Sequence, residues 1–336
     1  MKVGPFDTDR SVLVVAEIGN NHEGDFSLAQ EMVRRAAGCG VGAVKFQSVR
    51  AADLVRRSET ARFERLRKFE LSEDQFASLS KLARDLGLAF ISTPLSLPAA
   101  RFLEPMVDVY KIASGDNDFF PLVEEVGRTG KPVIISTGVS DVAKIEGAVR
   151  SLGMLWRSLG IRGEFALLHC VSAYPTPLDQ ANLRAIPFLG QRFACPVGYS
   201  DHTLGIDAAV LAVAAGARII EKHFTIDKQH SDFRDHQLSA DPPEMADLVR
   251  KIRETEVLLG DFGKRVQPCE AASQTAIRRS IVAARDLQAG TAIDAAALKW
   301  IRPGDALRPG SEADLLGRTL KRDIREDDAI RPDDVE

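Results

Sequence analysis

Short apolar runs alternate with longer amphipathic stretches along most of this chain, and this alternation restricts the folds that are open to it. Eight such pairs occur before residue 265, and the stretches between the runs carry apolar residues at helical spacing. The eight apolar runs are VLVVAEIG (12–19), AVKFQ (43–47), LAFISTP (88–94), VYKIAS (109–114), VIISTG (133–138), FALLHCVS (165–172), PVGYSD (196–201) and RIIEKHFT (218–225).

Apolar strands that alternate with helices predict an α/β fold with a parallel sheet covered by helices on its outer face. Eight strand–helix units in about 250 residues are what a closed (β/α)₈ TIM barrel needs. An open, doubly wound sheet is the alternative, but the turn after the first apolar run lacks the usual G-x-G-x-x-G pattern. We therefore expect the barrel.

The composition changes after LLGDFGKRVQPCEAAS (258–273), which is rich in linker-type residues. Beyond it, short runs are broken by Gly, Pro and Asp, and no long helix is expected. We predict a TIM-barrel domain over residues 1–265, a linker over 266–274 and a compact, turn-rich domain over 275–336.

Charge and cysteine content exclude several classes of protein. The chain has 336 residues, with 44 Lys and Arg against 48 Asp and Glu, and no block of like charge that would indicate a nucleic-acid partner. No signal peptide and no run of about 18 apolar residues is present, so no membrane segment is expected. The four cysteines are widely spaced, which is typical of reduced thiols in a cytoplasmic protein.

Polar side chains gather where the predicted strands end. In a TIM barrel these carboxyl ends share one rim, where the chemistry takes place. Taken singly, a Lys or Ser at a strand end is more often a solvated residue or a helix cap. Taken together, lysines and hydroxyls at one rim indicate a site for an oxyanion such as phosphate. The residues are Glu17, Asn20, Asn21, Lys45, Gln47, Ser92, Thr93, Lys111, Ser114, Ser136, Thr137, His169, Ser172, Tyr174, Ser200, Asp201, His202, Lys222 and His223.

Two histidines are candidate metal ligands. His202 and His223 end adjacent predicted strands, so both imidazoles could reach one divalent ion acting as a Lewis acid on a carbonyl. Mn²⁺, Fe²⁺, Co²⁺ and Zn²⁺ all suit such ligands. Two protein ligands are fewer than a catalytic zinc site normally has, so these residues alone leave the metal undecided. His22 and His169 are equally well explained as structural residues.

A series of ordered motifs carries a resemblance over nearly the whole chain. The motifs VVAEIGNNHEGDFSLA, AVKFQ, ISTP, YKIASGD, PVIISTG, LLHCVSAYPTP, VGYSDHT and IIEKHFT, in this order, resemble the sialic acid synthase (N-acetylneuraminate synthase) family. The segments RRSIVAARDLQAGT, WIRPGDALRPG and LLGRTL resemble the antifreeze-like (SAF) domain that this family carries, a domain of the β-clip type.

This resemblance implies a metal-dependent transferase that condenses phosphoenolpyruvate with the open-chain aldehyde of an N-acylated hexosamine. The products would be a nonulosonic, sialic acid-like acid and phosphate. The implied metal is Mn²⁺, for which Mg²⁺ or Co²⁺ can substitute. The implied assembly is a domain-swapped homodimer in the cytoplasm, with a role in polysaccharide biosynthesis.

The resemblance also assigns roles to individual residues. It implies that His202 and His223 hold the metal and that Glu17 is the active-site glutamate, acting as a base or by stabilising charge. Arg302 resembles an arginine that the antifreeze-like domain extends into the barrel of its partner, on the sugar side. The implied phosphoenolpyruvate contacts are Lys45, Thr93, Lys111, Ser114, Ser136 and Ser200, and the implied sugar contacts in the barrel are Tyr174 and Asp235.

Two departures from the family pattern affect the sugar side. Ser172 stands where many members have Asn, and Phe233-Arg234 replaces the usual Gly-Pro before Asp235-His236. These changes leave the sugar undecided among precursors of sialic, legionaminic, pseudaminic and other nonulosonic acids. Two other functions remain as alternatives: a condensing enzyme of the heptulosonate or octulosonate type, and a non-catalytic carbohydrate-binding barrel.

Overall fold

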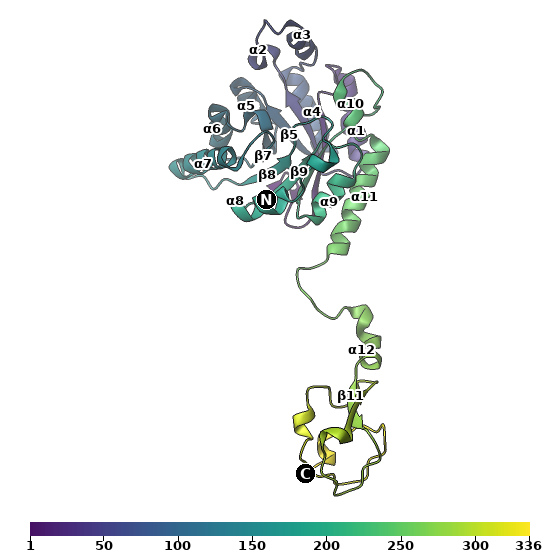
Figure 1. Ribbon diagram of the computed structural model, residues 1–336. Helices are drawn as coiled ribbons and strands as arrows, with labels where there is room; N and C mark the ends of the chain where they lie inside the picture. The colour runs from purple at the N-terminus through teal and green to yellow at the C-terminus, as the bar shows by residue number, and fades with distance from the viewer. The chain divides into compact units, whose positions relative to one another are not determined.

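The computed structural model describes residues 1–336, and its first unit contains a closed barrel of eight parallel strands, as the alternation predicts (Figure 1). The strands follow one another around the barrel in chain order, and β10 pairs with β3 to close it. The barrel strands are β3 (Leu13–Gly19), β4 (Ala43–Ser48), β5 (Ala89–Pro94), β6 (Val109–Ile112), β7 (Val133–Ser136), β8 (Phe165–Cys170), β9 (Val197–Asp201) and β10 (Ile219–His223).

Helices surround the barrel on its outside (Figure 1). Each strand is followed by at least one helix, so the crossover connections are those of a TIM barrel. The helices are α1 (Phe26–Gly38), α2 (Ala51–Leu54), α3 (Thr60–Lys68), α4 (Glu73–Asp85), α5 (Leu97–Leu103), α6 (Phe120–Arg128), α7 (Val142–Leu159), α8 (Ala185–Phe193), α9 (Asp207–Ala214), α10 (Arg234–Leu238) and α11 (Pro242–Leu259).

Side-chain caps fix the starts of several helices. Asp25, Asp141 and Asp241 each accept a hydrogen bond from a backbone N–H in the first turn of α1, α7 and α11. Ser72 caps α4 and forms a reciprocal capping box with Gln75. Such caps satisfy N–H groups that the helix itself leaves unpaired.

Successive residues of each strand face the helices and the barrel interior in turn. In β3, Val14 and Ala16 pack with the helices, whereas Leu13 and Val15 join an apolar cluster inside the barrel. An N-terminal hairpin of β1 (Lys2–Val3) and β2 (Phe6–Asp7) packs against this inner cluster, with Met1 and Val3 buried and Phe6 partly buried. The barrel interior is therefore a packed core at this end and not a pore.

The chain divides into two compact units, Met1–Gly260 and Asp261–Glu336. In the second unit, α12 (Ala271–Ile277) begins within the expected linker, so part of that segment is helical. After α12, strands β11 (Ser280–Ala283) and β12 (Leu298–Ile301) pair antiparallel, and the remaining helical segments are short 3-10 turns. A separate apolar cluster that includes Ile281 and Leu315 forms the core of this unit.

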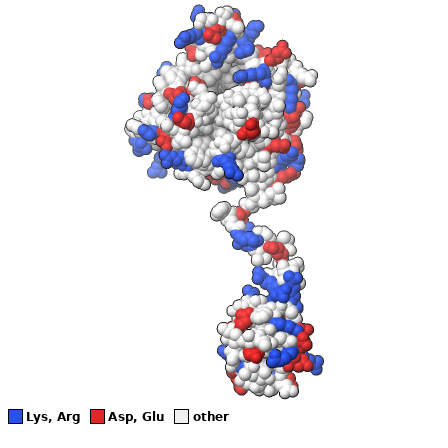
Figure 2. Space-filling model, in the orientation of Figure 1, with Lys and Arg blue, Asp and Glu red and all other residues white.

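The surface carries charges of both signs. On the face shown in Figure 2, Lys and Arg residues are interspersed with Asp and Glu residues over both units. This distribution fits the near balance of 44 basic and 48 acidic residues. None of the helices combines the length and the apolar character needed to cross a membrane.

Candidate active site

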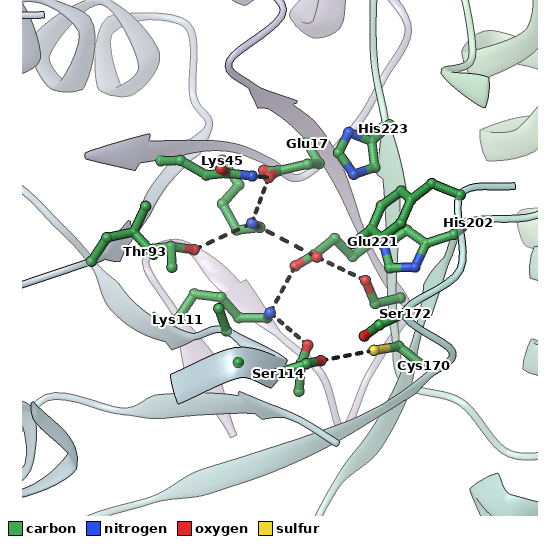
Figure 3. Close-up of a pocket in the computed structure, with 17 residues that line it drawn as sticks. Glu17, Lys45, Thr93, Lys111, Ser114, Cys170, Ser172, His202, Glu221 and His223 are labelled. Carbon is green, nitrogen blue, oxygen red and sulfur yellow. Dashed lines mark hydrogen bonds and ion pairs between the residues drawn. The ribbon is translucent and has the colours of Figure 1, made fainter. Parts of the chain in front are cut away.

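The inward-facing positions of the strands change from apolar to polar toward the carboxyl end of the barrel. In β3, Leu13 and Val15 lie in the inner apolar cluster, and Glu17, the next inward position, lines a cavity of about 220 Å³. Polar side chains from strands around the barrel point into the same cavity (Figure 3). The further polar or sulfur-bearing residues that line the cavity from the strands are Lys45, Gln47, Thr93, Lys111, Ser136, Cys170, Ser200, Glu221 and His223.

Most of the sequence-predicted site residues in the barrel unit line this one cavity. They are Glu17, Lys45, Thr93, Lys111, Ser114, Ser136, Tyr174, Ser200, His202 and His223. Asp235 lies outside the lining, at the start of α10. Arg302 follows β12 in the second unit, and its implied role in a homodimer stays a prediction.

Glu221 bridges two buried amines in the cavity, and the sequence analysis did not assign it to the site. Lys45 Nζ lies 2.8 Å from Glu17 Oε1 and 3.7 Å from Glu221 Oε1, and Lys111 Nζ lies 3.7 Å from Glu221 Oε2. Ser200 donates a hydrogen bond of 2.9 Å to Glu221. Glu221 lies two residues after Ile219, which faces inward in the structure, and inward positions recur every second residue.

The two carboxyl groups of this cluster have opposite pKa shifts. Burial raises the pKa of Glu221, but Lys111 and Lys45 outweigh burial and lower it to about 2. Burial also raises the pKa of Glu17, and Lys45 offsets that effect only in part because Glu221 adds a like charge. Glu221 is thus held as a carboxylate, whereas Glu17 binds a proton more readily than an ordinary glutamate.

The two amines also differ. Burial lowers the pKa of Lys45, but the charges of Glu17 and Glu221 outweigh it, so the net pKa is raised. Burial lowers the pKa of Lys111, and Glu221 opposes this only in part, so the net pKa is lowered. Lys111 also donates a hydrogen bond of 2.6 Å to Ser136. An anion placed beside Lys111 would supply the negative charge that this buried amine lacks.

A close backbone approach forms the wall of the cavity after β7. Gly138 donates its N–H to Ser114 Oγ at 3.0 Å, and Ser114 Oγ lies 3.0 Å from Cys170 Sγ. A Cβ on Gly138 would lie 2.3 Å from Ser172 Oγ and 2.8 Å from both Ser114 Oγ and Cys170 Sγ. Only glycine leaves room for these polar side chains, so we expect Gly138→Ala to distort the cavity.

Two imidazoles lie side by side at the edge of the cavity. The ring centroids of His202 and His223 are 5.6 Å apart, and the ring of Tyr174 lies 4.2 Å from that of His202. Burial lowers the pKa of His223 to about 3 and also lowers that of His202, so both rings are neutral near pH 7. His202 Nδ1 lies 2.8 Å from the Val171 carbonyl oxygen, which assigns the proton to Nδ1 and leaves Nε2 with a lone pair.

These rings fit the chemistry of a divalent-metal site. The buried Nδ1 of His223 has no hydrogen-bond partner in the protein, and both rings are in the neutral form that binds metals. No group of three or more His, Cys, Asp or Glu side chains is arranged to hold an ion. The protein therefore offers two imidazoles, and water or substrate would have to supply the other ligands.

Several polar residues at strand ends do not line the cavity. We expected all the polar strand-end residues to share one site, and this expectation is wrong for the residues that follow. Lys222 forms an ion pair of 2.9 Å with Asp201 and lines no part of the cavity. Ser92 donates to the Phe46 carbonyl, and His169 Nε2 lies 2.8 Å from the Ala181 carbonyl. Each of these strand residues is next to an inward-facing residue, so its own side chain lies on the other face of the sheet.

The rim beside the imidazoles carries both departures from the family pattern. Ser172 lines the cavity. Phe233 packs against Phe69 with ring centroids 5.1 Å apart, and Arg234 places its guanidinium carbon 4.7 Å from the centroid of the Tyr174 ring. The replaced loop residues thus have defined contacts near the cavity.

Comparison with known families agrees with this architecture. The sequence matches the NeuB family over residues 32–264 and the SAF domain over residues 278–336. The chain belongs to the NeuB family. The SAF match lies within the second compact unit of this NeuB-family protein, as the antifreeze-like motifs predict.

Relatives of this NeuB-family protein match it over almost their whole length. An uncharacterized protein of Methanocaldococcus jannaschii is 44% identical and covers 96% of this chain and 94% of its own. The N,N'-diacetyllegionaminic acid synthase of Legionella pneumophila is 36% identical with the same coverage. The N-acetylneuraminate-9-phosphate synthase of Mus musculus is 33% identical and covers 96% of this chain and 92% of its own.

A solved structure supports the same assignment. The N-acetylneuraminic acid synthetase of Leptospira borgpetersenii, crystallised with citrate, is 34% identical and superposes with a TM-score of 0.73. The match covers 78% of this chain and 90% of that one. Fold and sequence therefore point to the same family.

Proposed function

We propose that this NeuB-family protein is a synthase that condenses phosphoenolpyruvate with the open-chain aldehyde of an N-acylated hexosamine. The products are a nonulosonic acid and phosphate. The observation that carries the proposal is that two buried amines, several hydroxyls and two neutral imidazoles line one small cavity. Relatives named as legionaminic and neuraminic acid synthases support the same reaction class.

The amines and hydroxyls bind phosphoenolpyruvate. Lys111, Ser136 and Ser114 supply donors on one side of the cavity, and Lys45 supplies an amine on the other. Phosphate and carboxylate oxygens are acceptors that suit these groups. Glu221 lies between the two amines, 3.7 Å from each, so phosphoenolpyruvate meets donors that are already in place.

His202 and His223 would hold a divalent cation, with Mn²⁺ as the first candidate. Such an ion, when bound, supplies Lewis-acid polarisation of the sugar aldehyde oxygen. The carbonyl of Val171 fixes the orientation of the His202 ring, and Tyr174 packs against the face of that ring. These contacts hold the ring in place before substrates arrive.

Glu17 is the base for the water that completes the reaction. C3 of phosphoenolpyruvate forms a bond to the aldehyde carbon, and the aldehyde oxygen takes a proton from solvent water. Positive charge that develops at C2 is relieved when water adds there, and Glu17 accepts the proton from that water. Glu17 suits the role because its Oε2 is buried without a partner and its pKa is raised. Cleavage of the bond between C2 and the phosphate oxygen then releases phosphate, and the new C2 hydroxyl loses its proton to solvent and becomes the 2-keto group.

The decisive experiment measures phosphate release from phosphoenolpyruvate with Mn²⁺ and a panel of sugars. The panel contains 2-acetamido and 2,4-diacetamido hexoses, a phosphorylated 2-acetamido hexose, unsubstituted aldoses and a phosphorylated arabinose. We expect release with an acylated hexosamine. Release only with unsubstituted aldoses would contradict the proposal, and release only with the phosphorylated arabinose would indicate an octulosonate-type enzyme.

A variant tests the role of the imidazoles. We expect His223→Ala to abolish phosphate release and the response to added Mn²⁺ while the melting temperature stays close to that of the parent protein. Chelation of the parent protein should also stop release, and Mn²⁺ should restore it. Unchanged turnover in His223→Ala would refute the metal assignment.

A further inference from the structure

We propose that Arg234 is a specificity-determining residue that binds the acylamino carbonyl of a neutral, unphosphorylated sugar. This inference rests on the proposed function and adds to it the residue that recognises the acyl group. Arg234 is the first residue of α10, which follows β10, and its guanidinium lies beside the Tyr174 ring.

The guanidinium of Arg234 is held over an aromatic ring that lines the cavity. Its central carbon lies 4.7 Å from the centroid of the Tyr174 ring, a distance typical of cation–π stacking. Tyr174 in turn lies 4.2 Å from His202. Arg234, Tyr174 and His202 therefore form a stack that leads from the rim to the candidate metal site.

The terminal nitrogens of Arg234 remain available to a ligand. Its one hydrogen bond within the protein is from Nε to Asp235 Oδ1, at 3.3 Å, and neither terminal nitrogen donates to a protein acceptor. The side chain is 68% exposed. The contact with the Tyr174 ring keeps the guanidinium near the cavity, so its free donors are close by before the sugar binds.

The loop that carries Arg234 is anchored at several points. Phe233 packs against Phe69 at 5.1 Å between ring centroids. His236, which is fully buried, contacts Thr225 Oγ1 at 2.7 Å through Nδ1 and Glu23 Oε1 at 3.0 Å through Nε2. The backbone on either side of Arg234 is thus anchored by the Phe233 ring and by the buried hydrogen bonds of His236.

The charges around Arg234 favour a neutral acceptor over a phosphate group. Asp235 offsets the charge of the guanidinium at 3.3 Å. Lys45 and Lys111 are engaged with Glu17 and Glu221 inside the barrel. A phosphate dianion here would meet one compensated cation and one carboxylate, whereas an amide carbonyl needs only a donor.

The test compares two sugars in two variants. The first sugar is the acylated member of the panel with the highest kcat/KM, and the second is its analogue with a hydroxyl in place of the acylamino group. We expect Arg234→Met to lower kcat/KM for the acylated sugar by about 10- to 100-fold, as loss of a charge-assisted hydrogen bond does, and to leave the analogue nearly unchanged. Arg234→Lys should fall between, since it keeps the charge but loses the planar stack.

Controls separate this inference from the proposed function. The KM for phosphoenolpyruvate should not change in Arg234→Met, and Arg34→Met, which removes an exposed arginine from α1, should behave like the parent protein. Equal losses for both sugars, or a best substrate that carries a phosphate group, would overturn the role of Arg234. Failure of the parent protein with every acylated sugar would instead overturn the proposed function, and the inference with it.

Discussion

The two ends of the barrel interior are built on the same backbone pattern but have opposite chemistry. At the amino end, the inward positions are Leu13, Val15, Ile91, Ile134 and residues like them, packed in a dry cluster. At the carboxyl end, the next inward positions on the same strands are carboxylates, amines, hydroxyls and an imidazole around a cavity. The apolar end holds the strands together, so the polar end can keep charges that would otherwise destabilise the fold.

The polar end tolerates its charges because they are paired. Lys45, Lys111, Glu17 and Glu221 are all nearly fully buried, and each contacts an opposite charge within 4 Å. Removing a carboxylate or an amine from water costs free energy that pairing only partly recovers. We infer that the polar residues lower the stability of the fold but serve to bind substrate. Variants at the two ends of the barrel should therefore affect stability and activity to different degrees.

The largest expected effect comes from removing a charge at the polar end. Lys111→Met deletes an amine that we assign to phosphoenolpyruvate, so phosphate release should fall by about a thousandfold. The unfolding free energy should change far less, by about 1–2 kcal/mol, because Glu221 keeps Lys45 and Ser200 and the burial cost of the amine is removed. Steady-state kinetics and urea unfolding measure the two quantities on the same sample.

The outcome of Lys111→Met would be informative in either direction. If Lys111→Met greatly lowers the unfolding free energy but leaves phosphate release in the folded protein unchanged, the polar cluster is structural. The proposed difference between the two ends of the barrel would then be wrong. Ser151→Ala, on α7 and away from the cavity, serves as a control for handling because its hydroxyl has only a long contact of 3.4 Å with Glu124.

The second prediction concerns the apolar end, where a substitution should lower stability but leave activity nearly unchanged. Ile91 is fully buried in the inner cluster, so Ile91→Ala should lower the unfolding free energy by about 2–5 kcal/mol through lost burial and the cavity that remains. The kcat/KM of the folded fraction should stay within about twofold, since Ile91 lies below the polar layer. Ile91→Val, which removes one methylene, should cost about 1 kcal/mol. Loss of activity at full stability would contradict the separation of the two ends.

Much of this arrangement could be predicted from the sequence because barrel strands and their helices leave separate local patterns. The eight apolar runs coincide with β3 to β10 within a few residues. The family motifs led to ten residues that share the cavity. Local pattern sufficed here because each motif sits at a strand end, and closure of the barrel brings these ends together.

The sequence did not predict which residues of each strand point into the barrel. A strand buried on both faces is apolar throughout, so its residues do not reveal which of them point inward. Lys222 and Glu221 are neighbours, yet Glu221 faces the cavity and Lys222 pairs with Asp201. Only the observed register, with Glu17 beside Lys45 and Glu221 beside Ser200, separates the two sets.

The third prediction concerns acid and again contrasts the two ends. The inner apolar cluster contains no ionisable side chain, so sensitivity to acid must come from elsewhere, and His22, in the loop after β3, is one source. Burial lowers the pKa of His22 to about 4 from 6.5, although Asp25 and Glu23 oppose the shift. Its Nδ1 accepts the Gly24 N–H at 3.0 Å, and its Nε2 is buried without a partner.

Because the pKa of His22 is lower in the folded state than in the unfolded state, the protein is more stable when His22 is neutral. The contribution of His22 is therefore complete above pH 6.5 and is lost as the pH falls through about 4, by about 3 kcal/mol in total. His22→Asn keeps an acceptor for Gly24 but cannot take up a proton, so its stability should fall less steeply between pH 7.5 and 4 than that of the parent protein. Urea unfolding at several pH values measures the difference, and parallel curves for the two proteins would show that His22 titrates normally when folded.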